Sequence, residues 1–259
     1  MTNYKLLVDT AVLAGEIMLS SGAETYRVED TMYHILNTSN SDSTEALALM
    51  TGIVVTVNDG SLAQPITMMK TINDRTTNMS NIIKVNDISR KYCGGQITLE
   101  EAYQALGKVR GKQYNRTIYN LATAGIATGF AIMLGGRMQE VATAAIVGLL
   151  LATIITLGKI AKWNGIVIHT LSGIGIAMLT LVCKEFVVLD LDKDIVMISA
   201  VMPIVPGVAI TNAIRDTLQA DYLSGCARIL EAFLTAASVA VGIGLGMLLV
   251  NGMMGGNIL

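Results

Sequence analysis

The sequence predicts an α-helical membrane protein, with five transmembrane helices preceded by a small cytosolic α/β domain. Of the 259 residues, 52% are hydrophobic and only 15% are charged, and the mean hydropathy is +0.55. Soluble domains usually carry about 25% charged residues. The charged side chains are concentrated before Arg116, so we expect a cytosolic α/β domain over residues 1–116 and a membrane domain over residues 117–259.

The amino-terminal domain should begin with two helices. Apolar residues at helical spacing predict an amphipathic helix over 6–19, and Asp9 and Glu16 within this stretch argue against a signal peptide. Gly22 is suited to a left-handed helix C-cap, and a second helix is expected over 23–36. Two antiparallel helices are therefore predicted.

A hairpin and two more helices should complete this domain. The stretch 47–57 is β-branched towards its end and reads as a strand, followed by a turn at 58–60 and a second strand over 65–72. A helix is expected over 80–92. Another should open at Thr98, because Glu101 stands three residues later, at the capping-box spacing.

Five stretches without charge follow, and each approaches the roughly 20 apolar residues that cross a hydrocarbon core. They are residues 117–136, 141–158, 163–183, 195–214 and 232–259. Small residues recur in "GIATG", "SGIGIA" and "VGIGLG", which predicts close packing of helices.

The distribution of Lys and Arg predicts an N-in, C-out topology. The ends that would face the cytoplasm carry Lys108, Arg110, Lys112, Arg116, Lys159, Lys162, Arg215 and Arg228, whereas the opposite ends carry Arg137, Lys184 and Lys193. Cytoplasmic loops are enriched in these two residue types, so the amino-terminal domain is expected inside the cell.

The fourth span contains helix breakers. Proline removes a backbone donor and clashes with the preceding turn, so Pro203 and Pro206 with Gly207 should break or kink this helix. Half-helix ends at such breaks form substrate sites in many transporters. A plain kink packed against a neighbouring helix explains the same residues.

Charged residues follow the break. Asn212, Arg215 and Asp216 lie about one turn apart, and Arg228 and Glu231 open the last helix. Arg215 with Glu231, or Asp216 with Arg228, could pair. Such pairs form a scaffold, or they combine an arginine that binds carboxylates with an acid that carries protons.

A histidine lies well inside the third span. With an intrinsic pKa of about 6.5, His169 is suited to proton transfer near neutral pH. An inert histidine that is hydrogen-bonded to Thr170 or Ser172 is the alternative.

Charged residues also mark the start of the second helix. Glu24 and Arg27 are three residues apart, as are Arg27 and Asp30, so they can share one helix face. They form a solvated ladder of ion pairs along the helix face, or Glu24, Arg27 and Glu29 form a charged group that gates the solute. An enzymatic variant would use Glu24 or Glu29 as general base with His34 nearby, but no nucleophile motif supports it.

Metal, cofactor and nucleic-acid functions find no support in the sequence. Cys93, Cys183 and Cys226 are far apart, without metal-ligand spacing or a disulfide framework. The formal net charge of -2 gives no indication of nucleic-acid binding. We therefore expect no cofactor and no metal.

Two separated motifs resemble the threonine/serine exporter family, in particular the larger subunit of its two-component bacterial form. They are "GAETYRVEDTM" from residue 22 and "PGVAITNAIRDTLQADYLSGCARILEA" over 206–232. By position, the first motif falls on Gly22, Ala23, Glu24, Thr25, Arg27 and Glu29, and the second on Pro206, Gly207, Asn212, Arg215, Asp216, Ser224, Gly225, Arg228 and Glu231.

The resemblance implies an exporter in the cell inner membrane that forms an oligomer with a second small membrane subunit. Threonine and serine are the first expected substrates, and the proton gradient is the expected driving force. Asp216, Glu231 and His169 are the proton-coupling candidates. The alternatives are export of a dicarboxylate such as succinate, a membrane-anchored hydrolase that uses the amino-terminal domain, and a scaffold subunit that does not transport.

Overall fold

The computed structural model describes residues 3–73, 75–109 and 115–254, which form two compact units. The first consists of the described residues of Met1–Gly111 together with Gly207–Leu230, and the second of those of Lys112–Pro206 together with Glu231–Leu259. The segment Gly207–Leu230, expected in the membrane domain, therefore belongs to the same unit as the amino-terminal residues. Arg110 and Lys112, which contribute to the predicted topology, lie outside the described residues. Residues 255–259, the last part of the fifth predicted span, also lie outside them.

The first unit begins with the two predicted helices, α1 (Tyr4–Ser20) and α2 (Thr25–Leu36), which pack against each other. Gly22 ends α1 with a φ of 82°. The amide of Gly22 donates to Leu19 O at 3.1 Å, and that of Ala23 donates to Met18 O at 3.0 Å. These bonds satisfy carbonyls that the helix end leaves free, and the left-handed backbone they require favours glycine.

A three-stranded antiparallel sheet follows, with the order β1 (Ser43–Leu49), β2 (Gly52–Asn58) and β3 (Ile66–Thr71). The predicted hairpin after residue 57 is confirmed. The prediction of a single strand over 47–57 was wrong, because the chain turns at Met50 and Thr51 so that Leu49 pairs with Gly52. Neither turn residue is a typical turn former, so the apolar run conceals the turn.

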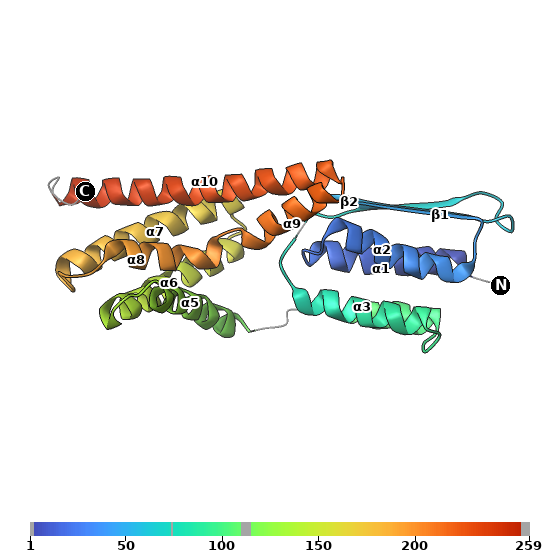
Figure 1. Cartoon of the computed structure of the whole chain (residues 1–259), viewed down its shortest axis with the longest axis horizontal. Helices are drawn as coiled ribbons and strands as arrows, with labels where there is room; N and C mark the ends of the chain where they lie inside the picture. Colours follow the sequence, from blue (N-terminus) through green and yellow to red (C-terminus); the bar gives the residue numbers. More distant parts are fainter. Residues whose placement is uncertain (1–2, 74, 110–114, 255–259) are drawn as a thin grey trace. The chain divides into compact units, whose positions relative to one another are not determined.

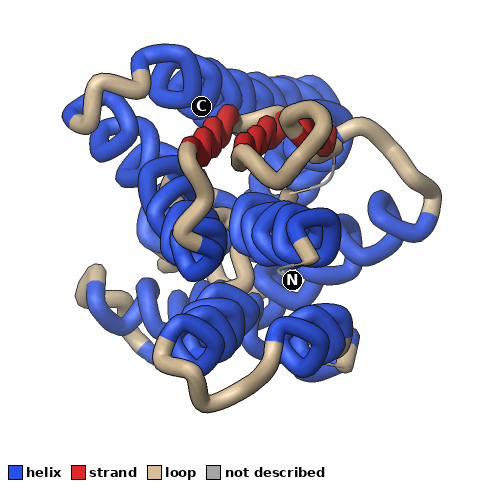
Figure 2. The backbone as a smooth tube through the Cα atoms, turned by 90° about the vertical axis from the view of Figure 1, so that its right-hand side faces the viewer, coloured by secondary structure: helices blue, strands red, loops and turns tan. Residues whose placement is uncertain are grey.

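The core of this unit lies between the sheet and the helices. Alternate residues of β2, namely Ile53, Val55 and Val57, are fully buried, and α1 and α2 pack against this sheet (Figures 1 and 2). The helices α3 (Met79–Cys93) and α4 (Leu99–Gly107) complete the layer beyond α1. The alternation is that of a sheet with one covered face.

The predicted capping box at the start of α4 is confirmed. The Glu101 amide donates to Thr98 Oγ1 at 3.2 Å, and the Thr98 amide donates to Glu101 Oε2 at 2.8 Å. The predicted start of this helix therefore coincides with the observed one.

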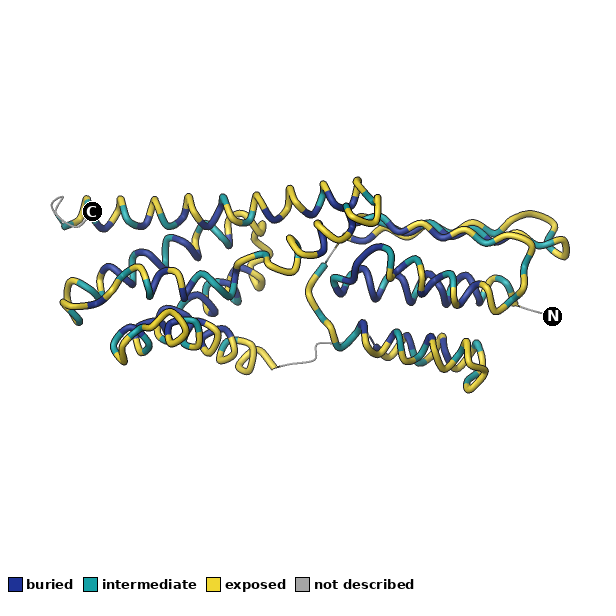
Figure 3. The backbone as a smooth tube through the Cα atoms, viewed as in Figure 1, coloured by how far each residue is buried: buried dark blue, intermediate teal, exposed yellow. Residues whose placement is uncertain are grey.

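The membrane-like helices belong mainly to the second unit. They are α5 (Arg116–Met133), α6 (Met138–Ile160), α7 (Gly165–Phe186), α8 (Lys193–Val201), the 3-10 turn η2 (Met202–Ile204), α9 (Gly207–Leu218) and α10 (Tyr222–Met253). Helix α9 and the start of α10 belong to the first unit. A further 3-10 turn, η1 (Asn37–Ser39), follows α2. Along α10, Figure 3 shows exposed positions recurring turn after turn, and many of them are large apolar residues.

Among the described residues, three helices are long and apolar enough to cross a membrane, namely α6, α7 and α10. The number rises to four if α8, η2 and α9 are counted as one broken span. The first predicted span forms α5, which is not among them and which carries Arg116 and Asn120 in its first turns. A fifth span thus stays a prediction.

The predicted break in the fourth span is confirmed. Helix α8 gives way to η2, which contains Pro203, and α9 starts only after Val205 and Pro206. Val205 is extended, with a ψ of 127°, as expected for a residue that precedes proline.

Glycines allow α7 and α10 to approach closely within the second unit. A Cβ added at Gly242 would lie 2.2 Å from Thr170 O, and one at Gly173 would lie 2.5 Å from Val239 O. The backbones therefore meet where the "SGIGIA" and "VGIGLG" stretches lie, as the sequence predicted.

We expect Gly242→Ala to destabilise the protein by about 1–3 kcal/mol, because the added methyl group overpacks a backbone contact. Gly244→Ala is the matched control on the same helix, since a Cβ there would meet nothing within 4 Å. Thermal unfolding of both purified variants in detergent measures the difference. Equal midpoints for the two variants would contradict the proposed close contact.

Candidate functional site

The first motif and most of the second, residues 207–230, lie together in the first unit. Residues at the start of α2 contact residues of α9 and of the first turns of α10. We call this set of residues the polar cluster; it consists of Gly22, Ala23, Glu24, Thr25, Arg27, Asn212, Arg215, Asp216 and Arg228. The structure thus unites side chains that the sequence placed at two different sites.

A buried ion pair forms the centre of the polar cluster. Arg228 Nε lies 2.8 Å from Asp216 Oδ2, and the side chains are 6% and 0% exposed. The other carboxylate oxygen, Asp216 Oδ1, accepts hydrogen bonds from the Thr25 hydroxyl at 2.9 Å and the Thr25 amide at 3.3 Å. This confirms the pairing of Asp216 with Arg228, one of the two predicted alternatives.

Arg228 also binds the loop before α2. Its Nη2 donates to Ala23 O at 2.9 Å, while Asn212 Nδ2 donates to Gly22 O at 2.9 Å. These carbonyls are available because the left-handed turn at Gly22 ends α1 just before them. The glycine turn therefore presents backbone acceptors to the polar groups of α9 and α10.

Glu24 lies between two arginines at the edge of the polar cluster. Its Oε2 is 3.0 Å from Arg27 Nε, and its Oε1 accepts a hydrogen bond from Arg215 Nη1. The Glu24 side chain is only 10% exposed, whereas those of Arg27 and Arg215 are 51% and 45% exposed. Glu24 is therefore no member of a solvated ladder, but a buried anion that holds two half-exposed cations.

The pKa of Arg27 is raised above its ordinary value. The main cause is the hydrogen bond of its Nε with Tyr26 Oη, at 3.1 Å, and the nearby Glu24 carboxylate adds to it. Arg27 thus remains a cation at every physiological pH.

A further hydrogen bond joins α10 to the β1–β2 turn, because the Met50 amide donates to Ser224 Oγ at 3.2 Å. The next residue, Gly225, lies against α9, where an added Cβ would be 2.3 Å from Thr217 Oγ1. Sequence reasoning missed the contribution of the turn, because it placed Met50 inside a strand.

Glu29 lies on α2, where its Oε1 accepts a hydrogen bond from the Ala48 amide at 2.9 Å. Burial raises the pKa of Glu29 above its usual 4.5. The hydrogen bond from the Ala48 amide lowers this pKa, and the charges of Asp221 and Asp216 raise it further, so the net shift is upward. The folded protein therefore holds the Glu29 proton more tightly than the unfolded chain does, and stability falls as the pH rises from about 4.5 through the raised pKa.

We expect Glu29→Gln to remove this pH-dependent loss. Glutamine keeps an oxygen for the Ala48 amide but cannot ionise. The variant should unfold at a higher temperature than the parent at pH 7, and the difference should vanish near pH 4. Unfolding midpoints across this pH range test it, and parallel curves for the two proteins would exclude a role of Glu29 ionisation.

The remaining candidate residues lie elsewhere. Pro206 stands at the helix break, and Gly207 begins α9. Glu231 and His169 belong to the second unit. His169 lies on α7, and its buried Nδ1 has no hydrogen-bond partner among the described residues.

The second unit contains a buried carboxylate that the sequence analysis did not select. Glu140, at the start of α6, is 1% exposed. Its Oε1 lies 3.4 Å from Arg137 Nη2 and accepts a hydrogen bond from the Asp192 amide at 3.2 Å, and Arg137 Nη1 also binds Asp190 Oδ2 at 2.8 Å. An acid directly preceding an apolar run was the available signal.

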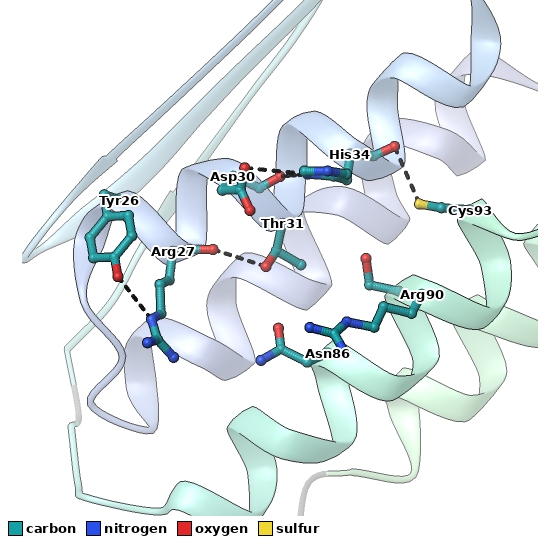
Figure 4. A pocket seen from close by; sticks show the side chains of 9 residues that line it. Tyr26, Arg27, Asp30, Thr31, His34, Asn86, Arg90 and Cys93 are labelled. Atoms are coloured by element: carbon teal, nitrogen blue, oxygen red, sulfur yellow. Dashed lines mark hydrogen bonds and ion pairs between the residues drawn. The ribbon is translucent and has the colours of Figure 1, made fainter.

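A cavity of about 410 Å³ in the first unit lies between α2 and α3 (Figure 4). It is lined by Tyr26, Arg27, Asp30, Thr31, His34, Asn86, Ser89, Arg90 and Cys93. Neither Glu24 nor Glu29 lines it, so the general-base arrangement considered for His34 gains no support from the contacts. Burial also raises the pKa of the Cys93 thiol, which disfavours the thiolate that a nucleophile requires.

The three cysteines are free thiols. Within the described parts of the chain, no three His, Cys, Asp or Glu side chains are grouped so that they could hold a metal ion.

Within the described parts of the chain, three apolar helices of spanning length, a possible fourth span that is broken at a proline, and an α/β region are the features of a multi-pass membrane protein. Residues 9–250 match the family described as "Putative threonine/serine exporter". The chain belongs to this threonine/serine exporter family, as its two motifs suggested.

A relative from Mycobacterium tuberculosis, named "Probable threonine/serine exporter", is 23% identical over 241 residues. The match covers 92% of this chain and 45% of the relative, so the chain spans about half the length of that protein. No solved structure matches the chain.

Proposed function

We propose that this chain is the larger subunit of a secondary transporter that exports threonine and serine across the cell inner membrane, driven by the proton gradient. Membership of the threonine/serine exporter family supports the substrate class. The polar cluster supports a mechanism, because it places a half-exposed arginine, Arg215, next to a buried acid, Asp216, on α9.

Arg215 is the group proposed to bind the solute carboxylate. Its guanidinium is 45% exposed and is held by Glu24, so a carboxylate can replace Glu24 without exposing an unpaired charge. Asn212, on the same helix, gives up its bond to Gly22 O to orient the solute further. Guanidinium suits this role because it binds carboxylates with two parallel hydrogen bonds.

Asp216 is the first candidate for the coupling proton. Protonation removes its charge, which releases Arg228 and weakens the link to Thr25. Binding of one proton would thus loosen the attachment of α2 to α9 and α10. Glu231 and His169 remain the other candidates, and the buried Nδ1 of His169 has no hydrogen-bond partner among the described residues.

The remaining features of the proposal follow from the sequence. Five spans in an N-in, C-out topology place the amino-terminal unit in the cytoplasm, and Glu24, Arg27 and Glu29 then act at a cytosolic gate. A second small membrane subunit of the same family completes the transporter, within an oligomer.

Efflux from vesicles tests the proposal. Vesicles containing this chain, with or without a coexpressed small subunit, are loaded with labelled threonine, serine or succinate and exposed to an imposed pH gradient. We expect gradient-dependent efflux of threonine and serine only when both chains are present.

Each other result selects an alternative. Efflux of succinate alone would make the protein a dicarboxylate exporter, and equal efflux after collapse of the gradient would refute proton coupling. Efflux with the small subunit alone would make this chain a scaffold. Hydrolysis of ester or peptide substrates that is lost in Glu24→Ala, without efflux, would favour the hydrolase.

A further inference from the structure

The cavity between α2 and α3 is not used by the mechanism proposed above. Its volume of about 410 Å³ falls within the range of about 300–1,000 Å³ of small-molecule sites. Charged and polar side chains dominate its lining, with Arg27, Asp30 and His34 supplied by α2, and Asn86 and Arg90 by α3 (Figure 4).

The charges in this cavity are only partly compensated. The Arg90 guanidinium has no hydrogen bond or ion pair within the described parts of the chain, whereas Arg27 is paired with Glu24. Asp30 Oδ1 lies 3.4 Å from His34 Nδ1, in an exposed pair that carries charge on the histidine only when it is protonated. The cavity therefore offers one uncompensated cation on α3 and one weakly compensated anion on α2.

We propose that this cavity binds a small zwitterionic α-amino acid. Arg90, with Asn86 one turn before it, receives the carboxylate, and Asp30 receives the ammonium group. A ligand with one charge of each sign satisfies both residues, whereas a dicarboxylate would leave Asp30 facing a second anion. That the amino acid is threonine or serine rests on the proposed transport function.

Arg27 connects this cavity to the polar cluster. Its guanidinium lines the cavity and also holds Glu24, which in turn binds Arg215. A carboxylate in the cavity competes with Glu24 for Arg27, and this competition leaves the Glu24 carboxylate more strongly paired with Arg215. The occupancy of the cavity depends on the amino acid concentration on the side of the membrane where the first unit lies. A change in this concentration thus changes the contacts of Arg215.

Cys93 provides a local measure of occupancy, because it is an exposed thiol in the cavity lining. In the full-length chain with Cys183→Ser and Cys226→Ser, the rate of Cys93 alkylation by N-ethylmaleimide is measured with and without threonine. At a threonine concentration about ten times Kd, labelling should slow about tenfold, because only the free cavity reacts.

Variants link the protection to the proposed contacts. Arg90→Gln and Asp30→Asn should each abolish protection by threonine. Lys84→Gln, which removes an exposed cation from the same helix α3, should retain it. A size-exclusion profile identical to that of the parent shows that each variant is folded.

The outcomes separate this inference from the transport function. Unchanged labelling in threonine or serine, in a preparation that exports them, would overturn the site and leave the transporter intact. Protection by succinate but not by threonine would overturn the assignment to an amino acid. Protection by threonine without any export would support the site while the transport proposal fails.

Discussion

Arg228→Met is expected to destabilise the protein by about 3–5 kcal/mol, because it leaves the Asp216 carboxylate buried without its counter-ion. Asp216 is 0% exposed and Arg228 only 5% exposed, so water cannot replace the missing partner. Asp216→Asn should destabilise the protein less, because Arg228 keeps its hydrogen bond to Ala23 O. Thermal and denaturant unfolding of the purified variants in detergent measures both.

The double variant Asp216→Asn with Arg228→Met distinguishes a paired charge from general damage. Asparagine keeps an oxygen for the Thr25 hydroxyl and amide, and no charge remains buried. The double variant should lose much less stability than the sum of the two single losses. Additive losses would mean that the two residues do not stabilise each other, and Lys84→Met controls for removal of an exposed charge.

Arg215→Lys should reduce export about tenfold or more while changing stability by less than about 1 kcal/mol. Lysine keeps the positive charge but cannot form two parallel hydrogen bonds to a carboxylate, and a loss of about 1.4 kcal/mol in binding is a factor of ten. The small effect on stability is expected because the guanidinium is 45% exposed and half-exposed ion pairs contribute little. Efflux from vesicles and the unfolding midpoint are compared on the same preparation.

Arg116→Lys is the matched control, because Arg116 is an exposed arginine at the start of α5. It should export at the parental rate. Normal export by Arg215→Lys would show that Arg215 does not bind the solute in a bidentate manner. If Arg215→Lys lowers the unfolding midpoint as well as the rate of export, the loss of export comes from unfolding and Arg215 is a structural residue.

Local features of the fold could be predicted from the sequence because their causes are local. The glycine turn after α1 and the capping box at Thr98 both depend on residues within one helical turn, and both are present. The break at Pro206 follows equally from the chemistry of one residue. The turn at Met50 and Thr51 could not be predicted, because its residues carry no turn signal and only the pairing of β1 with β2 requires it.

The polar cluster could be predicted as residues but not as an arrangement. Glu24 and Arg215 are 191 positions apart in the sequence, and nothing in the spacing of either motif shows that they meet. The sequence offered Asp216 or Glu231 as partners for the arginines, and it gave no indication that the loop at Gly22 and Ala23 supplies acceptors. The tertiary packing of α9 and α10 against the start of α2 determines this part of the site.

The length of α10 resolves an apparent conflict between its charge and its role as a membrane helix. It has 32 residues, which at 1.5 Å per residue amounts to about 48 Å, more than the hydrocarbon thickness of about 30 Å. Residues 232–253 contain no charged side chain and by themselves extend about 33 Å. The helix therefore has about three turns to spare at its amino-terminal end, and Arg228 lies in this surplus. Insertion of α10 into a bilayer thus does not require the charge that holds Asp216 to enter the hydrocarbon core.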